Sequence, residues 1–387
     1  MVLAFSEHLD DLLGTSIAEL DIPNHLHELA VRRYEHLGSS LCGDGTPGQG
    51  MDCEIHTQGS FRLGTVTQPI DPKSDYDIDL VCLRNLRKES TTQAGLKTEV
   101  GEHVIAYCAT RPEGLPAIDE GKRCWTLLYS TDPFHMDVLP AIPDEDGKAN
   151  AILLTDKELR NWQRSNPIEY AKWFHKTMER EFLEARVKLA RVLKAADIED
   201  VPAWKVKTTL QRSVQALKRH RDIFFINNPD LRPASIIITT LASRAYSGSG
   251  SMFEVLVDVS DKMPRLVEYI NGSWMIPNPV QEKENFADRW VDRPDKAQAF
   301  FDWIEQAHQD FQDYAKDHGI HKILERVAKT LGSAPARKAG TVFGSGLEAA
   351  RVAGNLKMAD QTGSLQQQVG RPVRDHTFHG DPPGKPA

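Results

Sequence analysis

The fold of this chain is decided by Gly59-Ser60-Phe61-Arg62-Leu63-Gly64-Thr65 and by the acidic stretch that follows it, Asp75-Tyr76-Asp77-Ile78-Asp79-Leu80-Val81. The second stretch predicts a strand, because polar and apolar residues alternate before an apolar run. Residues i and i+2 of a strand point to the same face, about 7 Å apart. Asp77 and Asp79 are therefore predicted to share one face.

Two carboxylates on one face of an apolar strand predict a bound cation, because they repel each other and are costly to bury unbalanced. Mg²⁺ takes oxygen ligands and leaves room for substrate phosphates. A third acid, Asp137, alternates out of the predicted strand Phe134-His135-Met136-Asp137-Val138-Leu139. Three such acids predict a site for two ions, about 3.5–4 Å apart, that activate an attacking hydroxyl and stabilise a leaving pyrophosphate. A lone Asp-x-Asp, by contrast, is usually a solvated turn or a surface strand.

The Gly59-Ser60 pair adds a phosphate-binding element to the acids. Glycine lets the backbone come close to a ligand, and backbone N–H groups with a serine hydroxyl can hold phosphate oxygens. On its own the pair could equally be an ordinary turn before a helix. His135 could act as a general base, but we expect it to face the opposite side of its strand and to pack there.

The three motifs together resemble the polymerase-β-like nucleotidyltransferases. Longer stretches are similar to the cGAS/DncV-like nucleotidyltransferases of bacterial CBASS antiphage operons: GSFRLGTVTQP…DYDIDLVC, FHMDVLPAIP, LQRSVQALKRHRD and RPASIIITTLASRAY. The similarity is strong over about residues 45–250 and weak elsewhere. The interval from Ser60 to Asp77 is longer than in many members of the superfamily, which affects the loop but not the acids.

The resemblance implies an α+β fold, in which a polymerase-β-like palm with a small mixed sheet packs against a helical domain. We expect an N-terminal helical region over residues 1–45, whose helix braces both lobes, a catalytic palm over 46–155 and a helical domain over 156–331. Residues 332–387 are rich in Gly, Gln, Pro and Arg and poor in large apolar residues. That composition predicts a flexible tail.

The resemblance also implies roles for the three acids and the Gly-Ser pair. Asp77, Asp79 and Asp137 would be the metal ligands and catalytic residues, with Asp137 nearest the attacking hydroxyl. Gly59 and Ser60 would hold the triphosphate.

Two residues of the helical half would add phosphate contacts. Lys218 would contact the triphosphate, although its basic run could equally be a solvated helix face. Ser235 would supply a second phosphate-binding hydroxyl, but as the residue after Pro233-Ala234 it could instead cap a helix. Related animal enzymes place a base-stacking tyrosine after this serine, where this chain has Ile236.

The implied reaction joins ATP and/or GTP, and possibly other nucleoside triphosphates, into a cyclic di- or trinucleotide and releases pyrophosphate. The implied cofactor is Mg²⁺ as two ions, with Mn²⁺ as a substitute. The implied partner is a downstream effector that senses the product. Some members are conjugated to other molecules through a C-terminal Gly or Ala. Ala387 is compatible with that, and an unstructured terminus is the alternative.

Charge and composition argue against the other classes of function. The formal net charge of −8 speaks against strong duplex nucleic-acid binding, and hence against a template-independent RNA or tRNA nucleotidyltransferase. A nucleotidyltransferase toxin would usually be smaller, and a non-catalytic binding module would lack an acid. The five cysteines form no C-x-x-C pair, and we expect reduced thiols in a cytoplasmic protein. No apolar run reaches the length that would cross a membrane.

Overall fold

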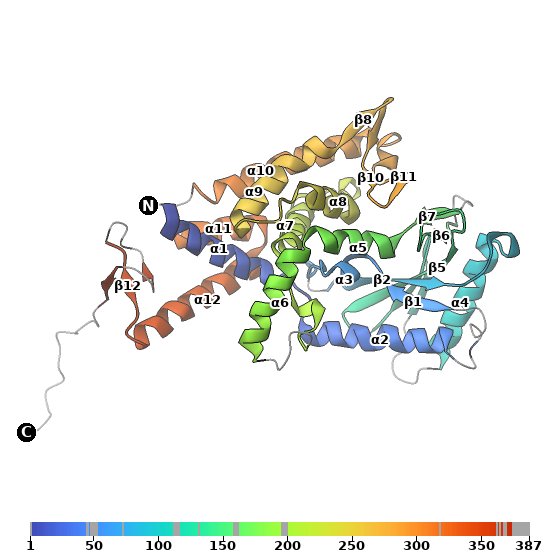
Figure 1. The fold of residues 1–387 in the computed structure, drawn as a ribbon, viewed down its shortest axis with the longest axis horizontal. Coiled ribbons are helices and arrows are strands. Elements are labelled where there is room, and N and C mark those ends of the chain that lie inside the picture. The colour runs from blue at the N-terminus through green and yellow to red at the C-terminus, as the bar shows by residue number, and fades with distance from the viewer. Residues whose placement is uncertain are drawn as a thin grey trace, which may run out of the picture.

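The computed structural model describes residues 2–43, 46, 53–71, 73–110, 117–130, 132–157, 162–194, 200–316, 319–360, 363, 365–366 and 370–373. Figure 1 shows a mixed sheet flanked by helices in one half of the molecule and a bundle of helices in the other. The predicted α+β class is confirmed. The palm half holds the sheet and the bundle contains most of the second half of the chain.

The sheet of the palm has the strand order β1–β2–β5–β4–β3, with β6 paired to β5 and β7 to β6. The central pair β2–β5 is parallel and the other pairs are antiparallel, so the sheet is mixed as expected. The strand bounds are Glu54–Thr57 (β1), Tyr76–Leu83 (β2), Ala117–Glu120 (β3), Trp125–Leu128 (β4), Phe134–Pro143 (β5), Ile152–Leu154 (β6) and Gln163–Ser165 (β7). Beneath the sheet, α4 (Gln93–Ala109) buries one apolar face in the same core as β2 and β5.

The N-terminal region is helical as predicted, but it forms two helices, α1 (Val2–Ala18) and α2 (Asn24–Cys42). Leu13 and its neighbours in α1 belong to the core of the helical half, whereas Leu37 and its neighbours in α2 belong to the core of the sheet. The expectation of one helix bracing both lobes is therefore wrong. The chain breaks before Pro23, which lacks the N–H that a continued helix requires. Helix α1 packs on the helical half and α2 mainly on the palm, although His27 of α2 also stacks on Trp204 of the helical half.

The helical half is built around α7, which contacts α8, α9, α10 and α1. Its helices are α5 (Pro167–Thr177), α6 (Glu179–Leu193), α7 (Thr209–Phe224), α8 (Ser235–Ala245), α9 (Met252–Lys262), α10 (Pro294–Asp313) and α11 (Ile320–Thr330). Short 3-10 turns lie at Lys88–Ser90, Ala203–Lys205, Pro229–Leu231, Met263–Leu266 and Asp288–Trp290. Two hairpins between α9 and α10 were not predicted: β8 (Glu268–Ile270) with β9 (Ser273–Met275), and β10 (Pro277–Asn278) with β11 (Gln281–Asn285).

The predicted flexible tail is wrong for its first part, because residues Ser333–Val352 form helix α12. This helix packs on α1 and α11. Its fully buried residues are small, among them Ala336 and Ala339, and they allow close approach, while the larger Phe343 is partly buried against the same core and contacts the ring of His8. Beyond it lie the short strands β12 (Lys357–Met358), β13 (Leu365–Gln366) and β14 (Arg371–Pro372). Ala387 lies outside the described residues, as does most of the Gly-rich region 43–50.

The expectation of five reduced thiols is wrong for two cysteines. Cys42, at the end of α2, forms a disulfide with Cys53, just before β1, with the Cα atoms 5.0 Å apart. Cys82, Cys108 and Cys124 take part in no disulfide among the described residues. In the part of the chain that the structure describes, no helix combines the length and hydropathy needed to span a membrane.

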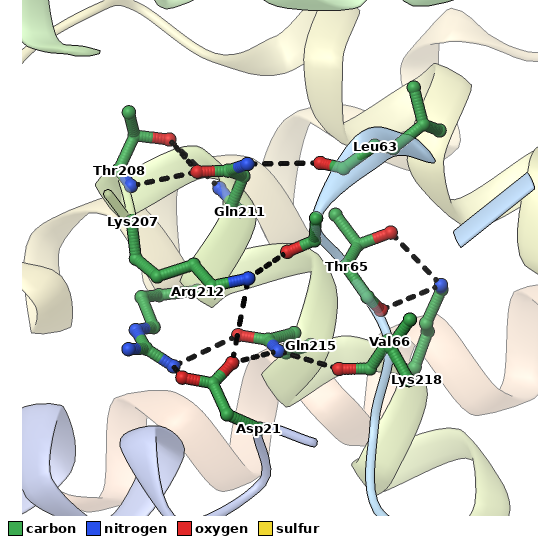
Figure 2. A network of polar contacts seen from close by, with 11 residues as sticks. Asp21, Leu63, Thr65, Val66, Lys207, Thr208, Gln211, Arg212, Gln215 and Lys218 are labelled. Atoms are coloured by element: carbon green, nitrogen blue, oxygen red, sulfur yellow. Dashed lines mark hydrogen bonds and ion pairs between the residues drawn. The ribbon is translucent and has the colours of Figure 1, made fainter. Parts of the chain in front are cut away.

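The junction between α1 and α2 is fixed by the carboxylate of Asp21. Arg212 Nη1 and Gln215 Nε2 of α7 each donate a hydrogen bond to it at 2.7 Å, and Lys207 Nζ lies 3.7 Å away (Figure 2). The Asp21 side chain is 25% exposed and that of Arg212 18%. At this depth an ion pair is only partly screened by water, so Asp21 joins the N-terminal helices to the centre of the bundle.

We expect Asp21→Asn to lower the free energy of unfolding by roughly 1–3 kcal/mol, because it leaves two partly buried cations without their counter-charge. Urea denaturation followed by circular dichroism measures this change. The matched control is Asp261→Asn, which removes an exposed partner of Arg265 and should change stability by about 0.5 kcal/mol or less. Equal effects of the two substitutions would contradict a structural role for Asp21.

Candidate active site

The parallel pairing of β2 with β5 brings the predicted acids together. Asp77 is opposite His135 and Asp79 is opposite Asp137 in the register. Residues paired in register point to the same face of a sheet, so all four side chains share one face. Ligand atoms of Asp77, His135 and Asp137 lie within 4.8 Å of one another. These residues form the one group of at least three potential metal ligands found among the described residues.

Asp79 is the most strongly perturbed of the acids. Burial, and after it the negative charges of Asp77 and Asp137, together raise its pKa to about 7. Its carboxylate packs against the turn at Gly59, where φ is +60° and a Cβ atom would lie only 2.3 Å from Asp79 Oδ2. Glycine is therefore required at position 59 for two reasons, the left-handed backbone and the contact with Asp79.

His135 was placed wrongly by the sequence analysis. It lies two residues from Asp137, so alternation puts both on the same face, and its Nε2 is 3.4 Å from Asp77 Oδ1. The hydrogen bond to Asp77 raises the pKa of His135. Thr126 of β4, which no sequence motif singled out, is opposite Asp137 and donates a 2.5 Å hydrogen bond to its Oδ1. His135 and Thr126 thus orient two of the three acids.

A cavity of about 950 Å³ opens beside these acids. Of the seven predicted site residues, six line it: Gly59, Ser60, Asp77, Asp79, Lys218 and Ser235. The seventh, Asp137, joins them through its cluster with Asp77. Gly59 and Ser60 form the first turn of α3 (Gly59–Leu63), which follows β1 directly. The structure therefore brings together residues from the palm and from α7 and α8 of the helical half.

Lys218 does not lie on a solvated helix face, so that alternative is wrong. It is 4% exposed, and its Nζ donates to the backbone oxygen of Thr65 at 3.1 Å and to Thr65 Oγ1 at 3.3 Å. Burial, with the nearby positive charge of Arg221, lowers its pKa to about 7. An anion in the cavity would favour the charged ammonium group.

Lys218 belongs to a row of α7 side chains that bind the loop after α3. Gln211 donates to the carbonyl oxygen of Leu63 at 2.9 Å, and Gln215 donates to that of Val66 at 2.7 Å. Figure 2 shows these bonds beside that of Lys218 to Thr65. The helical half therefore hydrogen-bonds to the backbone that follows the Gly-Ser turn, and these bonds fix the distance between that turn and α7.

Ser235 begins helix α8, but it is not the N-cap residue. The N-cap is Ala234, with no side-chain cap hydrogen bond, so the capping alternative is wrong. Ser235 Oγ instead accepts a 2.9 Å hydrogen bond from Arg221 Nη1. Arg221 and Arg232 both line the cavity and were missed as site residues. The basic run that begins at Lys218 was the signal for Arg221.

Comparison with known proteins decides the family. Residues 53–140 match the model of the nucleotidyltransferase domain of the cyclic GMP-AMP synthase DncV-like family. A c-di-GMP synthase of Roseivirga ehrenbergii is 32% identical over 359 residues, which cover 90% of this chain and 91% of the relative. The chain belongs to the DncV-like nucleotidyltransferases. It is an enzyme of the class that makes cyclic oligonucleotides.

Further similarities agree with this family. The cyclic dinucleotide synthase CdnG of Bradyrhizobium diazoefficiens is 25% identical over 74% of this chain and 71% of its own length. The solved structure of that CdnG with GTP aligns with a TM-score of 0.68, 21% identity, and coverage of 87% of this chain and 99% of that one. Escherichia coli DncV with 3′-deoxy GTP aligns with a TM-score of 0.55 and 15% identity, covering 86% and 89%. At these identities the two structures establish the shared fold of the DncV-like enzymes.

We expect Gly59→Ala to reduce turnover by about 100-fold or more, because the added Cβ displaces the Asp79 carboxylate and the backbone is left-handed. Pyrophosphate release from nucleoside triphosphates measures this loss. Gly248→Ala is the matched control, since φ there is +84° and no atom lies within 4 Å of the added Cβ. The control should lose about 1 kcal/mol of stability and keep its activity. Comparable activity losses in both variants would refute the role of the contact with Asp79.

The raised pKa of Asp79 has a consequence for stability in the absence of metal. An acid whose pKa rises on folding makes the folded state lose stability as pH increases from about 4 through about 7. Asp79→Asn removes this effect and should raise the free energy of unfolding at pH 8 by a few kcal/mol, because each pKa unit corresponds to about 1.4 kcal/mol. The gain should vanish near pH 4.

Thermal and urea unfolding in EDTA across this pH range measures the effect. Asp75→Asn, at an exposed acid just before β2, is the control and should show no such gain. A wild-type protein as stable as Asp79→Asn at pH 8 would contradict the electrostatic argument.

Proposed function

We propose that this DncV-like enzyme joins two molecules of GTP into a cyclic dinucleotide and uses Asp77, Asp79 and Asp137 to hold Mg²⁺. The observation that carries the proposal is the shared face of β2 and β5, where these acids crowd beside a turn suited to phosphate. The donor set fits the ion, because Mg²⁺ prefers carboxylate oxygens and a cation would offset the cost of charging buried Asp79. GTP is proposed because a c-di-GMP synthase is the relative 32% identical to this chain.

The protein's own groups would then divide the work. Asp137, oriented by Thr126, would accept the proton of the attacking ribose hydroxyl, and His135 would keep Asp77 in place. Bound Mg²⁺ would supply Lewis-acid stabilisation of the reacting phosphate and of the leaving pyrophosphate. Its binding would favour the deprotonated form of Asp79, because a nearby cation lowers the pKa of a carboxyl group.

The phosphate contacts would come from both halves of the molecule. Gly59 and Ser60 would hold the triphosphate through N–H groups and the hydroxyl. Lys218 would leave Thr65 for a phosphate oxygen, and Ser235 would contact a second phosphate beside Arg221. Lys218, Arg221 and Arg232 line the cavity and would offset part of the negative charge of a triphosphate, although the net charge of the whole chain is −8.

The wider assignments follow the family. We propose that the enzyme acts in the cytoplasm, in antiviral CBASS signalling, that Mn²⁺ can replace Mg²⁺, and that an effector senses the product. One neighbour of the same fold, CdnC of Escherichia coli MS115-1, was solved in complex with a HORMA protein. Protein partners are thus a reasonable expectation here too. Conjugation through Ala387 stays a prediction.

Incubation with Mg²⁺ and the four nucleoside triphosphates, singly and mixed, tests the proposal. We expect a phosphatase-resistant cyclic dinucleotide that contains guanine, identified by mass spectrometry, and at least about 100-fold less of it with Asp77→Asn/Asp79→Asn. The double variant Asp77→Asn/Asp79→Asn loses two of the three carboxylate charges that would bind the ion. Linear, phosphatase-sensitive products would overturn the proposal in favour of a template-independent polymerase. An equally active variant would exclude the acids as metal ligands.

A further inference from the structure

A second cavity, of about 730 Å³, lies on the other side of the Gly59 turn. It shares four lining residues with the catalytic cavity: Gly59, Leu63, Ala234 and Ile236. The two cavities therefore meet at the turn that packs against Asp79. An enzyme that joins two nucleotides needs two adjoining sites at one set of acids, and this cavity is placed to be the second.

The wall of this second cavity is closed by the unpredicted hairpin β10–β11. Strand β11 contacts β7 at the edge of the palm sheet, and Lys148 of the palm forms a 3.4 Å ion pair with Glu282 of β11. Figure 1 shows the hairpin reaching from the helical half toward β7. Residues 283–286 of β11 and the turn after it line the cavity, so the helical half presents this strand to whatever the cavity binds.

Glu284 is the distinctive group on this wall. Asn278 Nδ2 of β10 donates a 2.7 Å hydrogen bond to Glu284 Oε2, which fixes the carboxylate from behind. Within the described ranges, no other hydrogen bond is recorded for this carboxylate. Burial raises the pKa of Glu284, against the opposing effects of Asn278 and Arg123. A half-buried carboxylate with spare acceptor capacity calls for hydrogen-bond donors from a ligand.

We propose that Glu284 accepts hydrogen bonds from the N1–H and N2–H groups of a guanine base bound in the second cavity, and so selects GTP for that site. The inference rests on the proposed function and adds to it the residue that reads the base. Arg123 lines the same cavity and carries N–H donors of the kind that guanine O6 accepts. Ile236 lines both cavities at the position where related animal enzymes have a tyrosine that stacks on the base. Because Ile236 has no aromatic ring, we infer that the base is recognised through hydrogen bonds at its edge.

The chemistry of the other bases favours guanine. A carboxylate accepts hydrogen bonds but, when ionised, donates none. Guanine presents two adjacent donors on its Watson–Crick edge, whereas adenine and cytosine each place an acceptor next to one amino group. Uracil places two carbonyl acceptors around its single N–H. The cavity is also lined by five basic residues, Arg62, Arg123, Arg164, Lys283 and Arg289, so the preference for guanine rests on the hydrogen-bonding pattern of the Glu284 carboxylate and not on the net charge of the cavity.

The experiment compares GTP with ITP, which lacks only the N2 amino group, in the full-length protein with Mg²⁺. Wild-type enzyme should prefer GTP in kcat/KM by about 10-fold or more, since a site built to bond a substrate group rejects the analogue that lacks it. Glu284→Gln should lose about 10–100-fold in kcat/KM with GTP and less with ITP, so that the preference falls toward one. Glu282→Gln, on the same strand but with an 82% exposed side chain, should leave the preference unchanged.

Binding measurements keep the inference separate from the reaction. Calorimetric titration of GTP and ITP into wild type and Glu284→Gln should give the same loss of preference, whether or not a cyclic product forms. A Glu284→Gln protein with an unchanged unfolding midpoint and an unchanged preference would overturn the inference. If Glu284→Gln does not fold, Glu284→Asp replaces it. A Glu284→Asp protein that keeps the wild-type preference for GTP over ITP but accepts ATP as well as GTP would also overturn the inference. Absence of cyclic product from wild type would overturn the proposed function alone.

Discussion

The parallel pairing of β2 with β5 is the constraint on which the site depends. It aligns Asp77 with His135 and Asp79 with Asp137, so that acidic groups crowd on one face of the sheet. On the other face, Ile78 is completely buried in the core of the palm. Burial of that face stabilises the pairing, since roughly 25 cal/mol is gained per Å² of apolar surface removed from water. The strands therefore cannot separate to relieve the repulsion among the acids, which is offset by protonation of Asp79 and by the nearby His135 and would be offset further by a bound cation.

A second constraint comes from α7, which holds the loop after α3 by its backbone. Gln211, Gln215 and Lys218 all donate to carbonyl or hydroxyl oxygens of residues 63–66. These bonds are buried, where an unpaired polar group costs about 1–3 kcal/mol, so the loop and α7 move as one unit. The phosphate turn, fixed to the sheet by Gly59 against Asp79, is thereby also fixed to the helical half.

The sequence was sufficient for the features that depend on local patterns. The strand alternation around Asp77, Asp79 and Asp137 follows from short-range periodicity, the Gly-Ser turn was predicted from its residue types, and the α+β class was predicted from the resemblance to a known family. The position of His135 was available from the same alternation and was misread. The burial of Lys218 could not be obtained in this way, because a basic run reads as solvated until its tertiary contacts are known.

Other features depend on packing between distant segments. The segment that forms helix α12 was predicted to be a flexible tail because it contains few large apolar residues. Its small buried residues nevertheless pack closely on α1 and α11, which the sequence pattern alone does not reveal. The hairpin that carries Glu284 lies in a segment for which no strand was predicted, and its role depends on the contact of β11 with β7. On the proposed function the two cavities would make different contacts. Lys218 of the catalytic cavity would contact the triphosphate, whereas Glu284 of the second cavity would contact a base. Both cavities hold acidic and basic side chains, so the base would be selected by the fixed position of one carboxylate and not by the net charge of the cavity.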